Sequence, residues 1–367
     1  MVVLDLKLDG VYEFAHFDIN FTYPKRVVHS IIEDEHLEGR ERFRYKKAII
    51  LMGANATGKT TLGLALQKIF TYINTGDPAP LLEMAMKDQA SFEIDFVNGG
   101  FTLHRLSGTI CRAADRVDIA YRSTEIGKTD FYEKCIQNFL DRTSELEKDP
   151  QYLRQSVGEI HARFACPWTD PSPKLAEADP EIVLKTLRAV IGTLDPSLRD
   201  ISTPEHTHNT FLIHRRNQDI IIQEGKILHR ELLSGGTAQG IDAALFLASM
   251  MGDDISFYFC DERFAGVQSD VEKMLFTLMM ERVQNNEQLI FTTHNTDMLD
   301  LNLPKHSFVF LRREPEDGDF RICAMSASDV LKRNTDSVKC AMVNDVFASL
   351  PDLSLLAELD LGWPHHE

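Results

Sequence analysis

Hydrophobic positions near the start of the chain alternate with polar ones. This alternation runs through residues 1–28 and predicts short strands that each bury one face; its apolar members are Val3, Leu4, Leu6, Leu8, Phe17, Ile19 and Phe21. Residues 48–52 (AIILM) are apolar throughout, which predicts a strand covered on both faces. A Gly-rich turn follows this run, and we expect a helix from about Lys59 to Thr71.

The middle of the chain changes its pattern twice. Two alternating runs, 92–97 and 101–104, flank Asn98-Gly99-Gly100 and predict a β-hairpin. Residues 129–165 are charged and predict helices, and 166–180 form a Pro-rich break. A further helix is expected over about 180–193, where apolar residues recur at helical spacing and favour a core-facing stripe.

The C-terminal half alternates between strand and helix patterns. The predicted elements are a strand at 211–222, a helix at 237–251, a strand at 255–260, a helix at 270–285 and a strand at 288–292. Such alternation is typical of an α/β sheet with helices packed on it. We therefore expect an α/β fold, with residues 1–367 forming a single domain.

Composition agrees with a globular chain. Hydrophobic residues make up 43% and charged residues 26% of the 367 positions, enough to bury a sizeable core. The longest apolar runs fall far short of the roughly 20 residues that a membrane span needs, so no membrane association is expected. The start of the chain lacks the features of a secretory signal, and the spacing of the six cysteines suggests neither a metal site nor a redox pair. These features predict a cytoplasmic protein with reduced thiols.

The formal net charge is −17, which argues against a surface that coats DNA broadly. Basic residues do cluster in two places, at positions 40–47 and 105–122. They are interpreted as solvated strand faces, with a local contact to nucleic acid or to a protein partner as the alternative.

The segment Gly53-Ala54-Asn55-Ala56-Thr57-Gly58-Lys59-Thr60 matches the pattern GxxxxGK[ST] between a predicted strand and a predicted helix. Glycines let the backbone N–H groups turn inward onto phosphates, and the helix N-terminus adds positive potential. Lys59 is expected to contact the β- and γ-phosphates, and the Thr60 hydroxyl to bind Mg²⁺. The motif predicts nucleotide binding, with ATP and Mg²⁺ as the cofactors.

Two adjacent acids, Asp261 and Glu262, end the predicted strand at 255–260. Many buried strands end in carboxylates, but in a chain with a phosphate-binding loop the pair gains a specific meaning. Asp261 is the candidate metal carboxylate, together with Thr60. Glu262 is the candidate catalytic group that orients and polarises the attacking water.

Ser234-Gly235-Gly236 opens the predicted helix at 237–251. A hydroxyl and two glycines at a helix start can bind an anion, although the same residues also form an ordinary helix cap. Because the chain already has one γ-phosphate site, a second is best explained if it serves the nucleotide of another copy. The last candidate is His294, which ends the strand at 288–292 and is placed to hydrogen-bond the γ-phosphate.

The order of these motifs resembles the ABC-type ATPase fold, and the details resemble the AAA-type, ABC-class ATPases grouped with SMC, RecF and OLD proteins. GANATGKTTL, SGGTAQG, QLIFTTHNTDMLD, FEIDFVNGG and LKRNTDSV carry the resemblance, which is weakest over residues 105–180. It implies a mixed sheet with an N-terminal antiparallel β part and a helical insertion at about 125–200. It also implies phosphate contacts from Asn55, Gly58, Lys59, Thr60 and Thr61, signature contacts from Ser234, Gly235 and Gly236, and hydrolysis by Asp261, Glu262 and His294.

The chain departs from the family pattern at two points. After Asp261-Glu262 the family often continues to Leu-His-Pro, whereas this chain reads Arg263-Phe264-Ala265-Gly266. The second departure concerns the glutamine of the family's Q-loop, for which Gln89, just before a predicted strand, is the candidate.

The resemblance implies an ATPase that dimerises head to tail on ATP, or forms a higher homo-oligomer. It would act as a switch for a separate effector, a nuclease or toxin, in bacterial anti-phage defence. The alternative is a DNA-repair or DNA-tethering ATPase of the RecF or SMC kind. A third interpretation is an assembly scaffold that binds ATP without hydrolysing it.

Overall fold

The computed structural model spans residues 1–367. It describes residues 1–26, 30–141, 149–166, 179–195, 198, 200–204, 207, 209–215, 219–251, 255–264, 266–316, 319–333 and 335–349. In that part of the chain, no helix is both long enough and apolar enough to span a bilayer.

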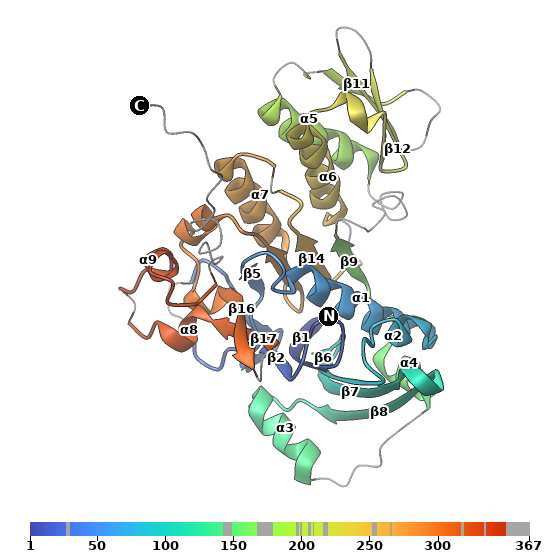
Figure 1. Ribbon diagram of the computed structural model, residues 1–367. Helices are drawn as coiled ribbons and strands as arrows, with labels where there is room; N and C mark the ends of the chain where they lie inside the picture. Colours follow the sequence, from blue (N-terminus) through green and yellow to red (C-terminus); the bar gives the residue numbers. More distant parts are fainter. Residues whose placement is uncertain are drawn as a thin grey trace, which may run out of the picture.

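A six-stranded mixed sheet lies at the centre of the molecule (Figure 1). Its strand order is β17-β16-β5-β15-β14-β9, with bounds β17 (Asp319–Ser326), β16 (Phe308–Glu316), β5 (Ala48–Met52), β15 (Gln288–Thr292), β14 (Phe257–Asp261) and β9 (Ala162–Ala165). All neighbours pair in parallel except β17, which is antiparallel to β16. The carboxyl ends of β5, β14 and β15 therefore meet at one edge of the sheet.

Both faces of this sheet are covered, as the apolar run at 48–52 predicted. Ile50 and Met52 belong to a core that includes α6 (Gly235–Ser249) and α7 (Ser269–Arg282). Ile49 and Leu51 face the opposite core, which contains α1 (Lys59–Thr75). Helix α1 lies so close to the sheet that a Cβ on Gly63 would come within 2.4 Å of the Phe259 ring, which fixes the helix relative to β14.

The N-terminal antiparallel part forms a second, five-stranded sheet. Its order is β2-β1-β6-β7-β8, with bounds β2 (Phe17–Asn20), β1 (Val2–Asp9), β6 (Gln89–Val97), β7 (Thr102–Cys111) and β8 (Arg116–Glu125). Strands β6 and β7 form the hairpin expected around Asn98-Gly99-Gly100. Helix α3 (Tyr132–Asp141) packs near β8, where Tyr132 donates a hydrogen bond to the buried Asp95.

Figure 1 places a third group of elements at the top of the view, above the central sheet. It contains α5 (Pro180–Leu194) and a four-stranded sheet in the order β10-β11-β12-β13, with bounds β10 (Asp200–Ser202), β11 (Thr210–His214), β12 (Ile220–Gln223) and β13 (Lys226–Leu228). Helix α6 packs against α5 and contributes to the same core as the central strands. It therefore joins the upper elements to the central sheet.

The remaining described elements are short. They are β3 (His36–Leu37), β4 (Arg40–Arg44), α2 (Ala79–Leu82), α4 (Pro150–Val157), α8 (Ala327–Val330) and α9 (Val338–Val343), with brief 3₁₀ turns between them.

Two local predictions were wrong. Residues 129–165 are not helical throughout, because β9 pairs with β14 at the edge of the central sheet. The predicted strand at 211–222 is two antiparallel strands, β11 and β12. In both cases the pairing partner decides the structure, and the local pattern carries little information about it. The single domain and the helical insertion at about 125–200 stay predictions.

Candidate functional site

The loop at residues 53–58 connects β5 to α1 and adopts a conformation that depends on glycine. Gly58 has a φ of 87° and caps the N-terminus of α1. A Cβ at this position would also lie 2.9 Å from the Phe14 ring, so a larger residue would meet both strain and a clash. Asn55 and Ala56 at the tip of the loop are exposed. The helix N-terminus is thus open to an anionic ligand.

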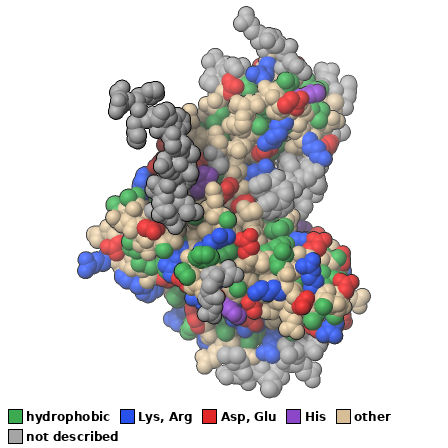
Figure 2. Space-filling view, in the orientation of Figure 1, with side chains coloured by type: hydrophobic (Ala, Val, Ile, Leu, Met, Phe, Trp, Pro, Cys, Tyr) green, Lys and Arg blue, Asp and Glu red, His purple; other side chains and the backbone are tan. Residues whose placement is uncertain are grey.

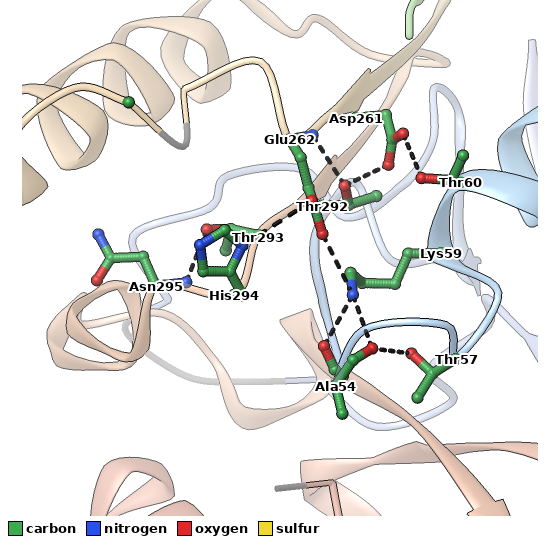
Figure 3. Close-up of polar contacts among 12 residues, drawn as sticks. Ala54, Thr57, Lys59, Thr60, Asp261, Glu262, Thr292, Thr293, His294 and Asn295 are labelled. Carbon is green, nitrogen blue, oxygen red and sulfur yellow. Dashed lines mark hydrogen bonds and ion pairs between the residues drawn. The ribbon is translucent and has the colours of Figure 1, made fainter. Parts of the chain in front are cut away.

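Lys59 lies at the centre of the site, and its side chain is only 4% exposed. Its ammonium donates hydrogen bonds to the carbonyl oxygens of Gly53 at 2.8 Å and Ala54 at 3.1 Å. It also forms an ion pair with Glu262, with 3.2 Å between Nζ and Oε1 (Figure 3). A buried ammonium needs such partners, and here they hold its charge at the mouth of the loop.

Asp261 ends β14 and is fully buried. Its Oδ2 accepts a hydrogen bond of 2.6 Å from the Thr60 hydroxyl, and its Oδ1 accepts one of 2.6 Å from Thr292 on β15. Burial raises the pKa of this carboxyl above its usual range, although both hydrogen bonds oppose the shift. The structure thus places the two candidate metal-binding residues, Thr60 and Asp261, in direct contact.

Asp261→Asn is expected to stabilise the ligand-free chain. Because its pKa is raised on folding, Asp261 binds a proton more tightly in the folded than in the unfolded chain. Burial of the Asp261 carboxylate therefore lowers the free energy of unfolding as the pH rises above the usual pKa of a carboxyl group. Protonation of the carboxylate removes this cost. The amide avoids the buried charge, and the threonine hydroxyls can accept as well as donate. Thermal unfolding near pH 8 should show a gain of about 1 kcal/mol, roughly 2 °C in Tm.

The gain should shrink as the solution is made acidic, because the raised pKa lets wild-type Asp261 take up a proton. Asp88→Asn is the matched control, because Asp88 is exposed and lies outside the helices and strands; this change should leave Tm unchanged. A lower Tm for Asp261→Asn both near pH 8 and in acidic solution would contradict this account of the site.

Glu262 has a φ of 45°, a left-handed conformation that is uncommon for a side chain of this size. Its backbone N–H donates to the Thr292 hydroxyl at 3.0 Å. Its second carboxylate oxygen, Oε2, lies 3.9 Å from Nδ1 of His294, whose side chain is 53% exposed. Figure 3 shows the Glu262 side chain pointing from the end of β14 toward Lys59, with His294 on its other side.

The turn that carries His294 is held by residues that the sequence analysis missed. Thr293 donates to the buried Glu272 of α7 at 2.7 Å, and Asn295 donates to the other oxygen of Glu272 at 2.7 Å. Burial raises the pKa of Glu272, while these hydrogen bonds lower it. The only signal in the sequence is the polar run TTHN after an apolar strand. It says nothing of the distant Glu272.

Ser234 caps the N-terminus of α6, where its hydroxyl accepts a hydrogen bond from the Thr237 N–H at 3.1 Å. Ser234 and Gly235 are exposed, and a Cβ on Gly235 would meet no atom within 4 Å. The predicted helix cap is therefore present, and its outer surface is free for a ligand.

The loop forms a cavity of about 290 Å³ lined by Glu13, residues 55–61 and Glu262. Ser234, Gly235 and Gly236 are not part of its lining. Ligand pockets typically measure about 300–1,000 Å³, so this cavity lies at the lower end of that range. Within the described residues of one chain, the structure brings together Lys59, Thr60, Asp261, Glu262 and His294. Of these, Lys59, Thr60 and Glu262 line the cavity, and the signature residues Ser234, Gly235 and Gly236 do not.

The residues present fit a triphosphate with a divalent cation. Lys59 is a buried cation held at the mouth of a loop whose helix N-terminus is open, which suits a phosphate chain. Thr60 and Asp261 together offer hydroxyl and carboxylate oxygens, the ligand type that Mg²⁺ prefers. Gln89 is an exposed residue at the start of β6, paired with Cys111 in the five-stranded sheet. Its assignment to the Q-loop stays a prediction.

No protein-family model matches the sequence. Structural maintenance of chromosomes protein 3 from Saccharomyces cerevisiae is 39% identical over 79 residues, which is 22% of this chain. The match covers 6% of that protein, so the chain corresponds to a small fraction of its length.

Two solved structures resemble the fold over nearly the whole chain. One is an Smc head bound to the C-winged helix domain of ScpA, with a TM-score of 0.51 and 13% identity, covering 91% of this chain and 100% of that chain. The other is an Smc head domain with an extended coiled coil, bound to the C-terminal domain of ScpA and derived from Pyrococcus furiosus. Its TM-score is 0.51 at 11% identity, and it covers 94% of this chain and 99% of that chain.

These likenesses define the class of the fold. The chain has the mixed α/β fold of SMC head domains, which is the ABC-type ATPase fold. The predicted fold class is confirmed.

Proposed function

We propose that the chain binds and hydrolyses ATP in a composite site shared by two copies, and that this cycle switches a separate effector protein. The contacts around Lys59 carry the proposal. The phosphate-binding lysine is paired with Glu262, and Thr60 is bonded to Asp261. Three strand ends and one helix thus supply the groups that phosphoryl transfer to water requires.

Each group has a distinct role in this proposal. The N–H groups of the loop and Lys59 bind the phosphates, with Asn55 and Thr61 at the edge of the same cavity. Thr60 and Asp261 would hold Mg²⁺, which would neutralise charge on the phosphates. Glu262 accepts a hydrogen bond from the attacking water and orients it. His294 donates a hydrogen bond to the γ-phosphate and so distinguishes ATP from ADP.

Two observations support completion of the site by a second copy. The P-loop cavity is small and lacks the signature residues, and Ser234 and Gly235 are exposed at the start of a helix. We call Ser234-Gly235-Gly236 the signature turn. In a head-to-tail dimer, the signature turn of each chain would bind the nucleotide held by the other chain. ATP would then stabilise the dimer, and its hydrolysis would release it.

The effector is proposed to be a nuclease or a toxin, and the setting bacterial anti-phage defence in the cytoplasm. This part rests on the family resemblance of GANATGKTTL and QLIFTTHNTDMLD. In this proposal the effector is a separate protein.

The second candidate is an ATPase that tethers or repairs DNA. The 39% identity with part of a structural maintenance of chromosomes protein favours it. The net charge of −17 does not. On the face shown in Figure 2, Lys and Arg side chains are interspersed with Asp and Glu and do not merge into one basic band.

Four measurements test the proposal and its alternative. ATP hydrolysis should occur, and light scattering should show a dimer that forms with ATP and dissociates as ATP is consumed. A chain that stays monomeric in saturating ATP would contradict the composite site. Duplex DNA binding that requires ATP and weakens steeply with salt would favour tethering. Copurification with a nuclease or toxin encoded beside it would favour the switch.

A further inference from the structure

Arg263 follows Glu262 directly and reaches back to helix α6. Its guanidinium lies 3.3 Å from Oδ2 of Asp242. It also donates a hydrogen bond to the carbonyl oxygen of Cys166, the residue after strand β9. One side chain thus connects the candidate catalytic position to β9 and to the helix that begins at Ser234.

Asp242 is the acceptor of this contact, and its side chain is only 6% exposed. It lies on a helix that is otherwise largely buried and apolar. A buried carboxylate is costly without cationic partners, and Asp242 has two. Arg230 approaches from the signature side of α6 at 2.8 Å, and Arg263 approaches from the end of β14.

A second contact joins the same two segments. The N–H of Gly266 donates a hydrogen bond of 2.6 Å to Oε1 of Gln239. The carbonyl oxygen of Gly266 lies 2.8 Å from where a Cβ of Gly236 would be. Gly236, Gln239 and Asp242 are spaced by three residues and share one face of α6. That face is where the residues after Glu262 contact the signature helix.

We infer that the Arg263–Asp242 ion pair positions Glu262 according to the state of the signature turn. The inference rests on the proposed function, and it makes Arg263 a positioning residue that does not itself touch the nucleotide. The signature turn of one chain binds the partner's ATP in that proposal. The ion pair then makes the geometry of each chain's own Glu262 depend on whether the partner site is filled.

The backbone geometry explains why such a link is effective. Glu262 holds an uncommon left-handed conformation, which persists only when surrounding contacts impose it. On one side, the Thr292 hydroxyl accepts a hydrogen bond from the Glu262 N–H. On the other side, the next residue is held by the contacts of the Arg263 side chain with Asp242 and Cys166. A small displacement of α6 is therefore passed to the Glu262 carboxylate, and a shift of about 1 Å can cost roughly 100-fold in rate.

Arg263→Met tests this inference, because it removes the charge and keeps most of the side-chain volume. The expected result is a fall in kcat of at least about tenfold, with an ATP affinity within about twofold of wild type because the P-loop is untouched. Arg263→Lys keeps a cation near Asp242 and should recover most of the lost rate. A purely structural role would not separate kcat from ATP affinity in this way.

Arg230→Met is the matched control. It removes the other arginine from the same carboxylate, and Arg230 has no contact with the 263–266 segment among the interactions described. Hydrolysis should stay within about twofold of wild type, and Tm should change no more than in Arg263→Met, because Arg230 is 49% exposed and Arg263 only 15%.

Two results would overturn the inference. One is hydrolysis by Arg263→Met within about twofold of wild type; the other is an equal loss in both Met variants that follows Tm. Failure of the proposed function is seen separately in Ser234→Arg. If that variant hydrolyses ATP normally, the signature turn does not contribute to the partner's site. Both the composite site and the coupling are then wrong. If Ser234→Arg is inactive and Arg263→Met is normal, only the coupling is wrong.

Discussion

Glu262→Gln is expected to lower ATP hydrolysis at least about 100-fold and to trap a dimer of the chain with ATP bound. The amide keeps the size and the hydrogen-bonding reach of the side chain, but it is a far weaker base and orients the attacking water poorly. Glutamine bears the same backbone cost at a φ of 45°, so the change isolates the charge.

ATP affinity should not fall in this variant. In the ligand-free chain the Glu262 carboxylate is paired with Lys59 at 3.2 Å, so it competes with the phosphates for the same ammonium. Glutamine removes that competition, and the ATP affinity should equal or exceed that of wild type. Equilibrium binding and light scattering in saturating ATP measure both effects. Glu281→Gln, an exposed residue of α7, is the control and should behave as wild type. A monomeric Glu262→Gln chain in saturating ATP would count against the dimer.

Lys59→Ala should weaken ATP binding by at least about 100-fold, and hydrolysis should be lost with it. The Lys59 ammonium is buried and directed into the loop by two carbonyl oxygens, so no other side chain of the cavity can replace its charge. Alanine at this site is a good helix former, and α1 should remain folded. Isothermal titration with ATP measures the loss.

Lys68→Ala is the matched control on the same helix. Lys68 pairs with the exposed carboxylate of Glu83, and such a surface pair contributes little. ATP binding by Lys68→Ala should equal that of wild type. Unchanged ATP affinity in Lys59→Ala would remove the P-loop assignment.

The sequence predicted three of the six central strands, β5, β14 and β15, because their signal is local; it did not predict β16 and β17, and it placed β9 in a helical region. β5 and β15 have the predicted bounds, since each is a continuous apolar run between polar turns. The P-loop was equally clear, because a phosphate-binding turn needs its glycines at fixed spacing. Asp261 and Glu262 could be identified because they end such a run beside that loop.

Other features depend on contacts that a local pattern does not encode. β9 is four residues long, and its pairing with β14 joins segments far apart in the chain. Glu272 looks like any helix carboxylate until the fold brings it to Thr293 and Asn295. Arg263 appeared only as a departure from a family pattern, and its significance comes from Asp242 on a separate helix.

Mixing two inactive variants tests the composite site most directly. Ser234→Arg should bind ATP but fail to hydrolyse it, because the ATP on each chain then faces the altered signature turn of the other chain. Lys59→Ala should not bind ATP. In a mixed dimer, the intact P-loop of the first variant faces the intact signature of the second, which restores one site of the two.

Neither variant can form an ATP-held dimer with itself, so mixed dimers should predominate in an equal mixture. Hydrolysis should therefore recover to at most about half of the wild-type rate, since each mixed dimer has one intact site of two. Recovery from two chains that are inactive alone is the result that the composite site predicts. No recovery in a mixture shown to contain mixed dimers, or full hydrolysis by Ser234→Arg alone, would contradict it.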